Sequence, residues 1–204
     1  MAKGIVEADL GRVKALLENV LGHSDYRDIQ RMGGLTNRTY RVEFPDGSRC
    51  MVRIPGEGTE ELIDRSDEKV STELACAIGI DAKLYYFGAD GAKVSEFVPN
   101  AVTMSAETMR EDKRIRQAAR LLKTLHGSGK DTGVKFEVFD MAAGYEKIIE
   151  ENAVYMYPDY AQVKAAVMDI KAQIDETCDI KKVPCHNDPL CENWVVSGDD
   201  DRMY

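Results

Sequence analysis

Residues 39–54, TYRVEFPDGSRCMVRI, decide how the first half of this sequence folds. Two runs, 39–44 and 50–54, alternate apolar and polar side chains, which is typical of strands with one buried face. Between them lies PDGS (45–48), whose proline, aspartate, glycine and serine favour a tight turn. The stretch therefore predicts an antiparallel β-hairpin.

Further elements are predicted on both sides of this hairpin. Apolar residues recur at helical spacing over residues 7–21, and Gly22 can end that helix. After the hairpin, TEELIDRSDEKVSTELACAIGI predicts a second helix, with Thr59 as its N-cap. The runs KLYYF (83–87) and AKVSEFV (92–98), joined by GADG, predict a second antiparallel pair.

After the second pair of strands the pattern becomes helical. Apolar residues recur at helical spacing over 111–126, 141–152 and 160–178. A half rich in strands followed by a half rich in helices predicts the α+β class. We expect two domains, residues 1–98 and residues 99–204.

The composition is that of a folded globular protein. Apolar residues make up 44% and charged residues 31% of the 204 residues, and the formal net charge is −9. A chain this acidic, without a local basic stripe, is a poor match for the phosphate backbone of nucleic acids. We therefore do not expect a nucleic acid as its partner.

The first residues and the cysteines predict the cell compartment. Glu7, Asp9, Arg12 and Lys14 interrupt the apolar residues of the first helix, so we expect neither a signal peptide nor a membrane span. The five cysteines form no CxxC pair, which favours reduced thiols. We expect a cytoplasmic protein that does not associate with membranes.

The segment HNDPLCEN (186–193) carries the chemistry of this sequence. Phosphoryl transfer to an alcohol needs a carboxylate that accepts the hydroxyl proton and an oxygen ligand that holds Mg²⁺ against the nucleotide phosphates. Asp188 and Asn193 supply both groups at the Asp-x4-Asn spacing of kinase catalytic loops. The alternative is a polar loop that only caps a turn. The apolar run 194–196 would anchor the loop and leave both side chains exposed.

The same segment resembles the His-x-Asp-x4-Asn signature of the aminoglycoside-phosphotransferase and choline-kinase superfamily. GGLTNRTYRV (33–42), VRIPGEGTEELIDRSDE (52–68) and LLKTLHGS (121–128) resemble the bacterial choline kinases in particular. The resemblance implies a protein-kinase-like fold, with an N-terminal antiparallel sheet lobe and an incomplete helical C-terminal lobe. It implies ATP-dependent phosphorylation of the hydroxyl group of choline. Ethanolamine, thiamine or an aminoglycoside remains an alternative substrate.

The resemblance also assigns the nucleotide-binding residues of the first lobe. Arg53 matches the basic residue of the third strand that contacts the phosphates, and Glu68 matches the helix carboxylate that pairs with it. The backbone of the hinge, Glu96-Phe97-Val98, would bind the adenine ring. The match to the hairpin that covers the phosphates comprises Gly33, Gly34, Thr36 and Asn37.

In the catalytic loop, the resemblance makes Asp188 the catalytic carboxylate and Asn193 the ligand of Mg²⁺. His186 would brace the loop, since Asp188 already serves as the base. We expect Trp194 in the core, which leaves Tyr155 and Tyr157 as candidate rings for a quaternary ammonium group.

The family's next motif, an Asp-Trp-Glu-like segment whose first Asp binds magnesium, has no counterpart in this sequence. We therefore expect a chain truncated just before it. The acidic residues 199–201 are expected to form a solvated turn and not a substitute metal site. A truncated helical lobe would expose apolar surface, so we expect self-association. A nucleotide-binding fragment without catalysis is the alternative function.

Overall fold

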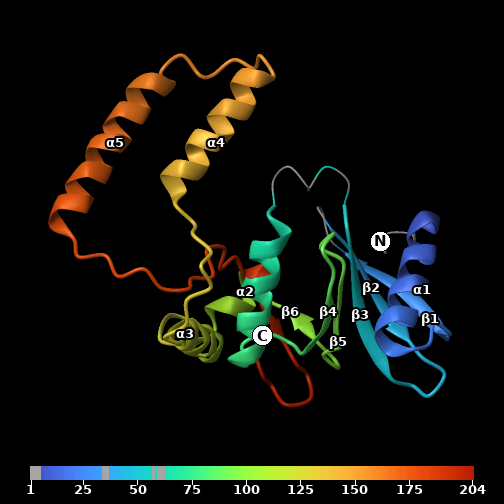
Figure 1. The fold of residues 1–204 in the computed structure, drawn as a ribbon. Helices are drawn as coiled ribbons and strands as arrows, with labels where there is room; N and C mark the ends of the chain where they lie inside the picture. The colour runs from blue at the N-terminus through green and yellow to red at the C-terminus, as the bar shows by residue number, and fades with distance from the viewer. Residues whose placement is uncertain (1–5, 34–36, 57, 59–62) are drawn as a thin grey trace. The chain divides into compact units, whose positions relative to one another are not determined.

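Helices and an antiparallel sheet occur in one chain, so the α+β class predicted from the sequence is confirmed (Figure 1). The computed structural model describes residues 6–33, 37–56, 58 and 63–204. Two compact units are present, one formed by residues 1–132 with 184–204 and the other by residues 133–183. The lobe boundary between residues 98 and 99 stays a prediction.

A five-stranded antiparallel sheet dominates the first unit, with the strand order β1-β2-β3-β5-β4. Its strands are β1 (Asp28–Gly33), β2 (Asn37–Glu43), β3 (Arg49–Pro55), β4 (Leu84–Phe87) and β5 (Lys93–Glu96). Both predicted hairpins are therefore present.

The first hairpin forms because its turn sequence matches its backbone. Gly47 has φ 85°, a left-handed conformation that glycine adopts without strain. The carboxylate of Asp46 accepts a hydrogen bond from the backbone N–H of Ser48 at 2.9 Å. With the turn fixed, β2 and β3 pair residue by residue from Asn37 with Pro55 onward.

Helix α1 (Glu7–Leu21) covers one face of this sheet. Its Val13 and Leu17 are fully buried, and each contributes about 2 kcal/mol through apolar burial. Gly22 ends the helix as predicted, with φ 77° and its N–H bonded to the carbonyl of Glu18. The buried sheet residues around it are Tyr40, Val42, Phe44, Cys50, Val52, Ile54 and Val94.

Helix α1 also brings a charged residue into this interface. Asp9 is 1% exposed, and its carboxylate accepts hydrogen bonds from Arg38 Nε at 2.5 Å and Nη2 at 2.8 Å. The hydroxyl of Tyr40 donates a third hydrogen bond to it at 2.6 Å. Burial alone would raise the pKa of Asp9, but the hydrogen bonds from Arg38 and Tyr40 outweigh burial and hold this pKa below its usual range.

Helix α2 begins later than the sequence predicted. It spans Arg65–Ala77, and its N-cap is Asp64, whose side chain accepts hydrogen bonds from the N–H groups of Ser66 and Asp67. The predicted cap Thr59 lies outside the described residues, and the prediction that it starts this helix is wrong. Aspartate, like threonine, is a favoured N-cap, so two competing start signals lay a few residues apart.

The remaining elements of the first unit form a second apolar cluster. Short strands β6 (Val102–Thr103) and β7 (Val195–Val196) pair with each other near helix α3 (Asp112–His126) and the 3₁₀ turns η1 (Thr108–Arg110) and η2 (Cys191–Asn193). The buried residues of this cluster are Met104, Trp194, Val196 and Met203. They hold the segment after HNDPLCEN in place.

The second unit consists of helices α4 (Val138–Glu151) and α5 (Tyr160–Thr177). Glu146 joins them, because it accepts hydrogen bonds at 2.6 Å from the hydroxyl of Tyr160 and from Nζ of Lys164. Neither helix has a buried residue. Throughout the described residues, no helix combines the length and apolar character needed to cross a membrane.

Candidate active site

Asp188 and Asn193 lie together in the loop that precedes β7. The side-chain amide of Asn193 donates hydrogen bonds to Asp188 Oδ2 at 2.9 Å and to the Asp188 carbonyl at 3.0 Å. Both side chains are exposed. The Asn193 side-chain oxygen makes no hydrogen bond in the described part of the chain. The pair therefore presents a carboxylate and an amide oxygen to the solvent.

His186 braces this loop from the other side. Its ring stacks on the ring of Trp194, with a centroid distance of 5.3 Å and an interplanar angle of 18°. Its Nδ1 accepts a hydrogen bond from the backbone N–H of Asp188 at 3.3 Å. Asn187, between them, has φ 64°, which asparagine tolerates better than most residues. These contacts fit the predicted bracing role of His186.

Trp194 anchors the loop to the second apolar cluster. Its side chain is 4% exposed, and its Nε1 donates a hydrogen bond to the carbonyl of Pro189 at 3.3 Å. The backbone carbonyl of Trp194 accepts a hydrogen bond from the N–H of Met104. A buried ring cannot stack on a substrate cation. Tyr155 and Tyr157, which are 98% and 82% exposed in the second unit, remain the predicted rings for that purpose.

Arg53 and Glu68 form an ion pair on the sheet face opposite α1. Val52 and Ile54 point into the core beside α1, so Arg53, between them on β3, points the other way. Its Nη2 lies 2.5 Å from Glu68 Oε1 and donates a hydrogen bond to the carbonyl of Gly91 at 2.9 Å.

The remaining donors of Arg53 have no partner in the described chain. Its Nε is buried without a hydrogen-bond partner, and its Nη1 makes no hydrogen bond either. A buried donor without an acceptor is costly. Nε is too deeply buried to touch a ligand, but an anion bound here could accept hydrogen bonds from Nη1, so the residues present fit a phosphate group.

Arg65 completes this cluster, and sequence reasoning missed it. Its Nη1 lies 2.6 Å from Glu68 Oε2, so each oxygen of Glu68 faces one arginine. Its side chain is 10% exposed. The available signal was spacing, because Arg65 lies three residues before Glu68 and shares a helix face with it.

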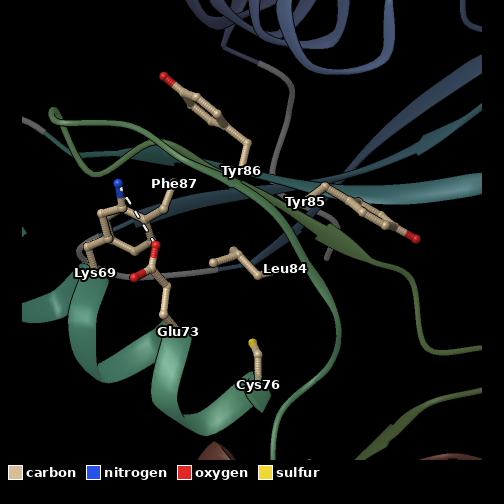
Figure 2. Close-up of a pocket in the computed structure, with 7 residues that line it drawn as sticks. All are labelled: Lys69, Glu73, Cys76, Leu84, Tyr85, Tyr86 and Phe87. Atoms are coloured by element: carbon tan, nitrogen blue, oxygen red, sulfur yellow. Dashed lines mark ion pairs between the residues drawn. The ribbon is translucent and has the colours of Figure 1, made fainter. Parts of the chain in front are cut away.

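A cavity of about 460 Å³ lies between α2 and β4 (Figure 2). Phe87 lines the cavity, and its ring also lies 5.5 Å from the guanidinium carbon of Arg53. Lys69 and Glu73 pair at 3.9 Å on the helix side. Phe87 therefore joins Arg53 to this cavity, while none of the predicted site residues lines it.

The predicted phosphate-covering hairpin is described only at its ends. Gly33 is the last residue of β1 and Asn37 the first residue of β2. Gly34 and Thr36 lie outside the described residues. Thr39 pairs with Arg53 across the β2–β3 ladder, so the first residues of β2 lie beside the Arg53 end of β3.

The predicted hinge follows β5. Glu96 ends this strand, and its carboxylate accepts a hydrogen bond from the backbone N–H of Lys83 at 3.2 Å. Phe97 and Val98 follow, both half-buried. The guanidinium of Arg49 lies 5.5 Å from the ring centroid of Phe97. The adenine-binding role of this segment stays a prediction.

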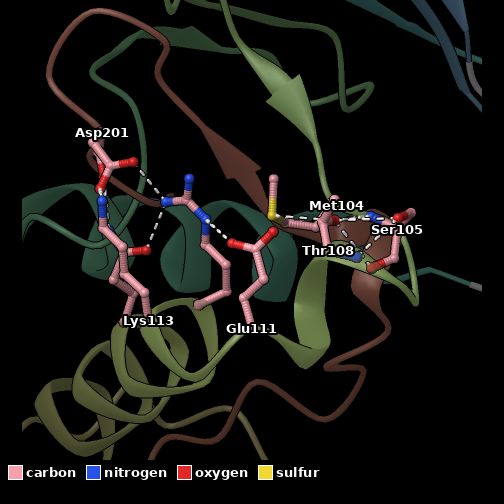
Figure 3. A network of polar contacts seen from close by, with 8 residues as sticks. Met104, Ser105, Thr108, Glu111, Lys113 and Asp201 are labelled. Carbon is pink, nitrogen blue, oxygen red and sulfur yellow. Dashed lines mark hydrogen bonds and ion pairs between the residues drawn. The ribbon is translucent and has the colours of Figure 1, made fainter.

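The acidic turn 199–201 is bound to the protein (Figure 3). Asp201 lies 2.5 Å from Nζ of Lys113 and 2.8 Å from Nη1 of Arg114, both on α3. The hydrogen bond from Lys113, with that from Arg114, holds the pKa of Asp201 below its usual range. Asp199 accepts a hydrogen bond from the side chain of Asn100 at 2.6 Å. The turn therefore fastens this part of the chain to Asn100 and to helix α3.

Two groups of predicted residues are thus assembled separately. In the part of the chain that the structure describes, no hydrogen bond or ion pair joins Arg53 or Glu68 to Asp188 or Asn193. No group of three or more His, Cys, Asp or Glu side chains among these residues could hold a metal ion. Asn193 has an amide oxygen free to act as a ligand, and the role of this residue as a Mg²⁺ ligand stays a prediction.

Comparison with known proteins identifies the family. The chain is 28% identical over 184 residues to Protein LicA of Haemophilus influenzae, covering 89% of this chain and 53% of that protein. It is 28% identical to the choline kinase LicA of Streptococcus pneumoniae, with a TM-score of 0.79, covering 95% of this chain and 66% of that one. A LicA structure in complex with AMP gives 29% identity and a TM-score of 0.78, with the same coverages of 95% and 66%.

The likeness to these kinase structures confirms the predicted kinase-like fold. The chain spans about half the length of the curated relative, at 53%, and 66% of the solved chains. The family model for choline/ethanolamine kinase matches residues 29–204. This match includes the sheet, helix α2 and the loop with Asp188 and Asn193, and the chain therefore belongs to the choline/ethanolamine kinase family.

Proposed function

We propose that this protein is an ATP-dependent phosphotransferase that phosphorylates the hydroxyl group of choline. The observation that carries the proposal is the exposed Asp188–Asn193 pair, with a carboxylate and an amide oxygen held by one hydrogen bond of 2.9 Å. The LicA proteins to which the chain is similar support a choline kinase. The AMP complex of LicA supports a nucleotide site in the corresponding fold.

In this proposal Asp188 binds the substrate hydroxyl group and accepts its proton. The hydroxyl oxygen then forms a bond to the γ-phosphorus of ATP, while the bond between that phosphorus and the bridging oxygen breaks and ADP leaves. Catalysis consists mainly of positioning and charge stabilisation, because the protein forms no covalent bond. His186 and Trp194 hold Asp188 in place.

The nucleotide is bound by the first lobe in this proposal. Arg53 donates hydrogen bonds to the phosphates through its Nη1, and Glu68 fixes the position of the guanidinium group. The backbone of residues 33–37 covers the phosphates, and the backbone of residues 96–98 binds adenine. Mg²⁺, when bound, supplies positive charge between the phosphates, and Asn193 would hold it.

The five free thiols support a reducing, cytoplasmic location.

The reaction is tested by following phosphocholine formation with ATP, Mg²⁺ and choline. We expect choline to be used with a higher kcat/KM than ethanolamine, thiamine or an aminoglycoside at equal ATP. A higher kcat/KM for ethanolamine would keep the kinase assignment and overturn the choice of choline. The same assay without the amino alcohol measures ATP hydrolysis and serves as the control.

A second candidate function is nucleotide binding without turnover. The described residues offer no cluster of three metal ligands, and Asp201 is committed to Lys113 and Arg114. Saturable ATP binding by calorimetry, together with no transfer to any of the four alcohols, would favour this function over the kinase.

We also propose that copies of the chain associate through α5. Exposed apolar residues lie along this helix at Val163, Val167, Ile170 and Ile174. Lys164 lies in its first half, while Asp175 and Glu176 lie at its end, so an antiparallel pair brings unlike charges together. We expect the sedimentation coefficient to rise with concentration, and Val167→Glu with Ile170→Glu to abolish the rise. The matched control is Ala165→Glu with Ala172→Glu, two exposed positions on the opposite side of α5, which keeps both the apolar stripe and Lys164 and should still associate.

A further inference from the structure

Two arginines share one carboxylate beside the proposed phosphate site. Glu68 Oε1 faces Arg53 Nη2 at 2.5 Å, and Glu68 Oε2 faces Arg65 Nη1 at 2.6 Å. The side chains of Arg53, Glu68 and Arg65 are 16%, 21% and 10% exposed. Two guanidinium groups and one carboxylate therefore lie in contact in a largely buried group.

Arg65 determines how Glu68 can bind Arg53. A carboxylate with both oxygens available prefers a bidentate pair with the guanidinium fork of arginine. Such a pair would occupy two nitrogens of Arg53 and neutralise its charge. Because Oε2 of Glu68 faces Arg65, Glu68 contacts Arg53 through Nη2, and Nη1 of Arg53 stays free to donate hydrogen bonds to a ligand.

The backbone around Arg65 is shaped for this arrangement. Gly91 has φ 83°, and a Cβ atom built on it would lie 2.7 Å from Cδ and Nε of Arg65. The carbonyl of this same glycine accepts the hydrogen bond from Arg53 Nη2. The turn between β4 and β5 therefore contacts both arginines and fixes their separation.

We propose that Arg65 is a positioning residue for the nucleotide phosphates. It occupies one oxygen of Glu68, so that Arg53 faces the phosphates with its Nη1 free to donate hydrogen bonds. This inference rests on the proposed function, because it takes the ligand of Arg53 to be the phosphate chain of ATP. It predicts that the contribution of Arg65 depends on the phosphates and not on the nucleoside.

The test is a set of binding measurements that need no catalysis. Isothermal titration with ATP, tripolyphosphate and adenosine is carried out on the wild-type chain and on Arg65→Met. We expect Arg65→Met to lower the affinity for ATP and for tripolyphosphate about tenfold each, equivalent to about 1.4 kcal/mol. The affinity for adenosine should be unchanged. Arg65→Lys should recover most of the affinity, because it restores the charge beside Glu68.

The matched control is Lys69→Met, one turn further along α2. It removes the same charge from a side chain that is 48% exposed and paired with Glu73, so ATP affinity should change less than about twofold. Thermal unfolding of each variant shows whether it is folded. Arg65→Gln, which removes the charge but keeps a polar side chain, keeps the test decisive if Arg65→Met does not fold.

The outcomes separate this inference from the proposed function. Equal loss of ATP and adenosine binding in Arg65→Met would show a general structural role and overturn the inference. Unchanged ATP binding in Arg65→Met would also overturn it, with the kinase proposal intact. The wild-type chain could also bind tripolyphosphate in an Arg65-dependent manner and bind ATP no more tightly than tripolyphosphate. In that case the phosphate site stands and the nucleotide function fails.

Discussion

Replacing Asp188 with asparagine should lower the turnover of choline about 10²- to 10⁴-fold, the usual contribution of a positioned general base. Asparagine has nearly the same size, and its amide oxygen can still accept the hydrogen bond that Asn193 donates at 2.9 Å. It cannot accept the hydroxyl proton. The loop should therefore keep its geometry while the reaction loses its base.

The affinity for ATP separates this role from a structural one. Arg53 and the hinge lie outside the catalytic loop, so the dissociation constant for ATP should change less than about twofold in Asp188→Asn. Phosphocholine formation and calorimetric ATP binding are the two measurements.

The control for this substitution is Asp199→Asn, which makes the same chemical change in an exposed turn bonded to Asn100. It should leave both quantities near the wild-type values. Turnover retained by Asp188→Asn would remove Asp188 from the mechanism. Loss of ATP binding together with turnover would show that the change disturbs the fold.

The first hairpin and the helix ends show which parts of the fold a sequence can predict. The β2–β3 turn and the end of α1 at Gly22 depend on residues within a few positions of each other, and glycine with positive φ is a local signal. The start of α2 was missed by several residues for the same reason. Thr59 and Asp64 give equivalent local signals, because both residue types are favoured at an N-cap, and the helix begins after Asp64.

The site residues divide along the same line. Asp188 and Asn193 could be predicted because both belong to one short loop with a fixed spacing. Arg65 was missed because its role depends on a contact between side chains. It lies one helical turn before Glu68 and binds the same carboxylate that pairs with Arg53. The close approach of Gly91 to Arg65 brings the β4–β5 turn against helix α2, and no local pattern contains this contact.

Asp9 is the clearest case of a residue that local pattern misjudges. In the sequence it is one of several charges on an amphipathic helix, and such charges usually lie in solvent. Its burial depends on Arg38 and Tyr40, which lie 29 and 31 residues later in the chain. A buried carboxylate is tolerated only with such partners.

Replacing Asp9 with alanine should therefore destabilise the fold strongly, by about 3 kcal/mol at neutral pH. The substitution leaves Arg38, which is 20% exposed, without its bidentate partner, and it leaves the Tyr40 hydroxyl without its acceptor. The free energy of unfolding in urea measures the effect. Glu7→Ala, in the first turn of the same helix on an exposed side chain, is the matched control and should change stability by less than about 0.5 kcal/mol.

The effect of Asp9 should depend on pH in one direction. The pKa of Asp9 is lowered in the folded state, so its stabilisation is complete above the unfolded-state pKa of about 3.9 and is lost as the pH falls through the folded-state value. The difference in the free energy of unfolding between the wild type and Asp9→Asn should therefore be constant from pH 7 to about pH 5, and it should become smaller below about pH 4. A difference that grows on acidification would contradict the assigned ion pair.

A double-mutant cycle isolates the cause of this destabilisation. If the cost of Asp9→Ala comes mainly from an uncompensated buried charge, then Arg38→Met should recover part of the stability when added to Asp9→Ala, although it destabilises the wild type. Methionine fills the space of the arginine stem without its charge. Additive losses in the double variant would show that Asp9 and Arg38 do not stabilise the interface of α1 and β2 as a pair. In that case the apolar contacts of Val13 and Leu17 alone would hold α1 on the sheet.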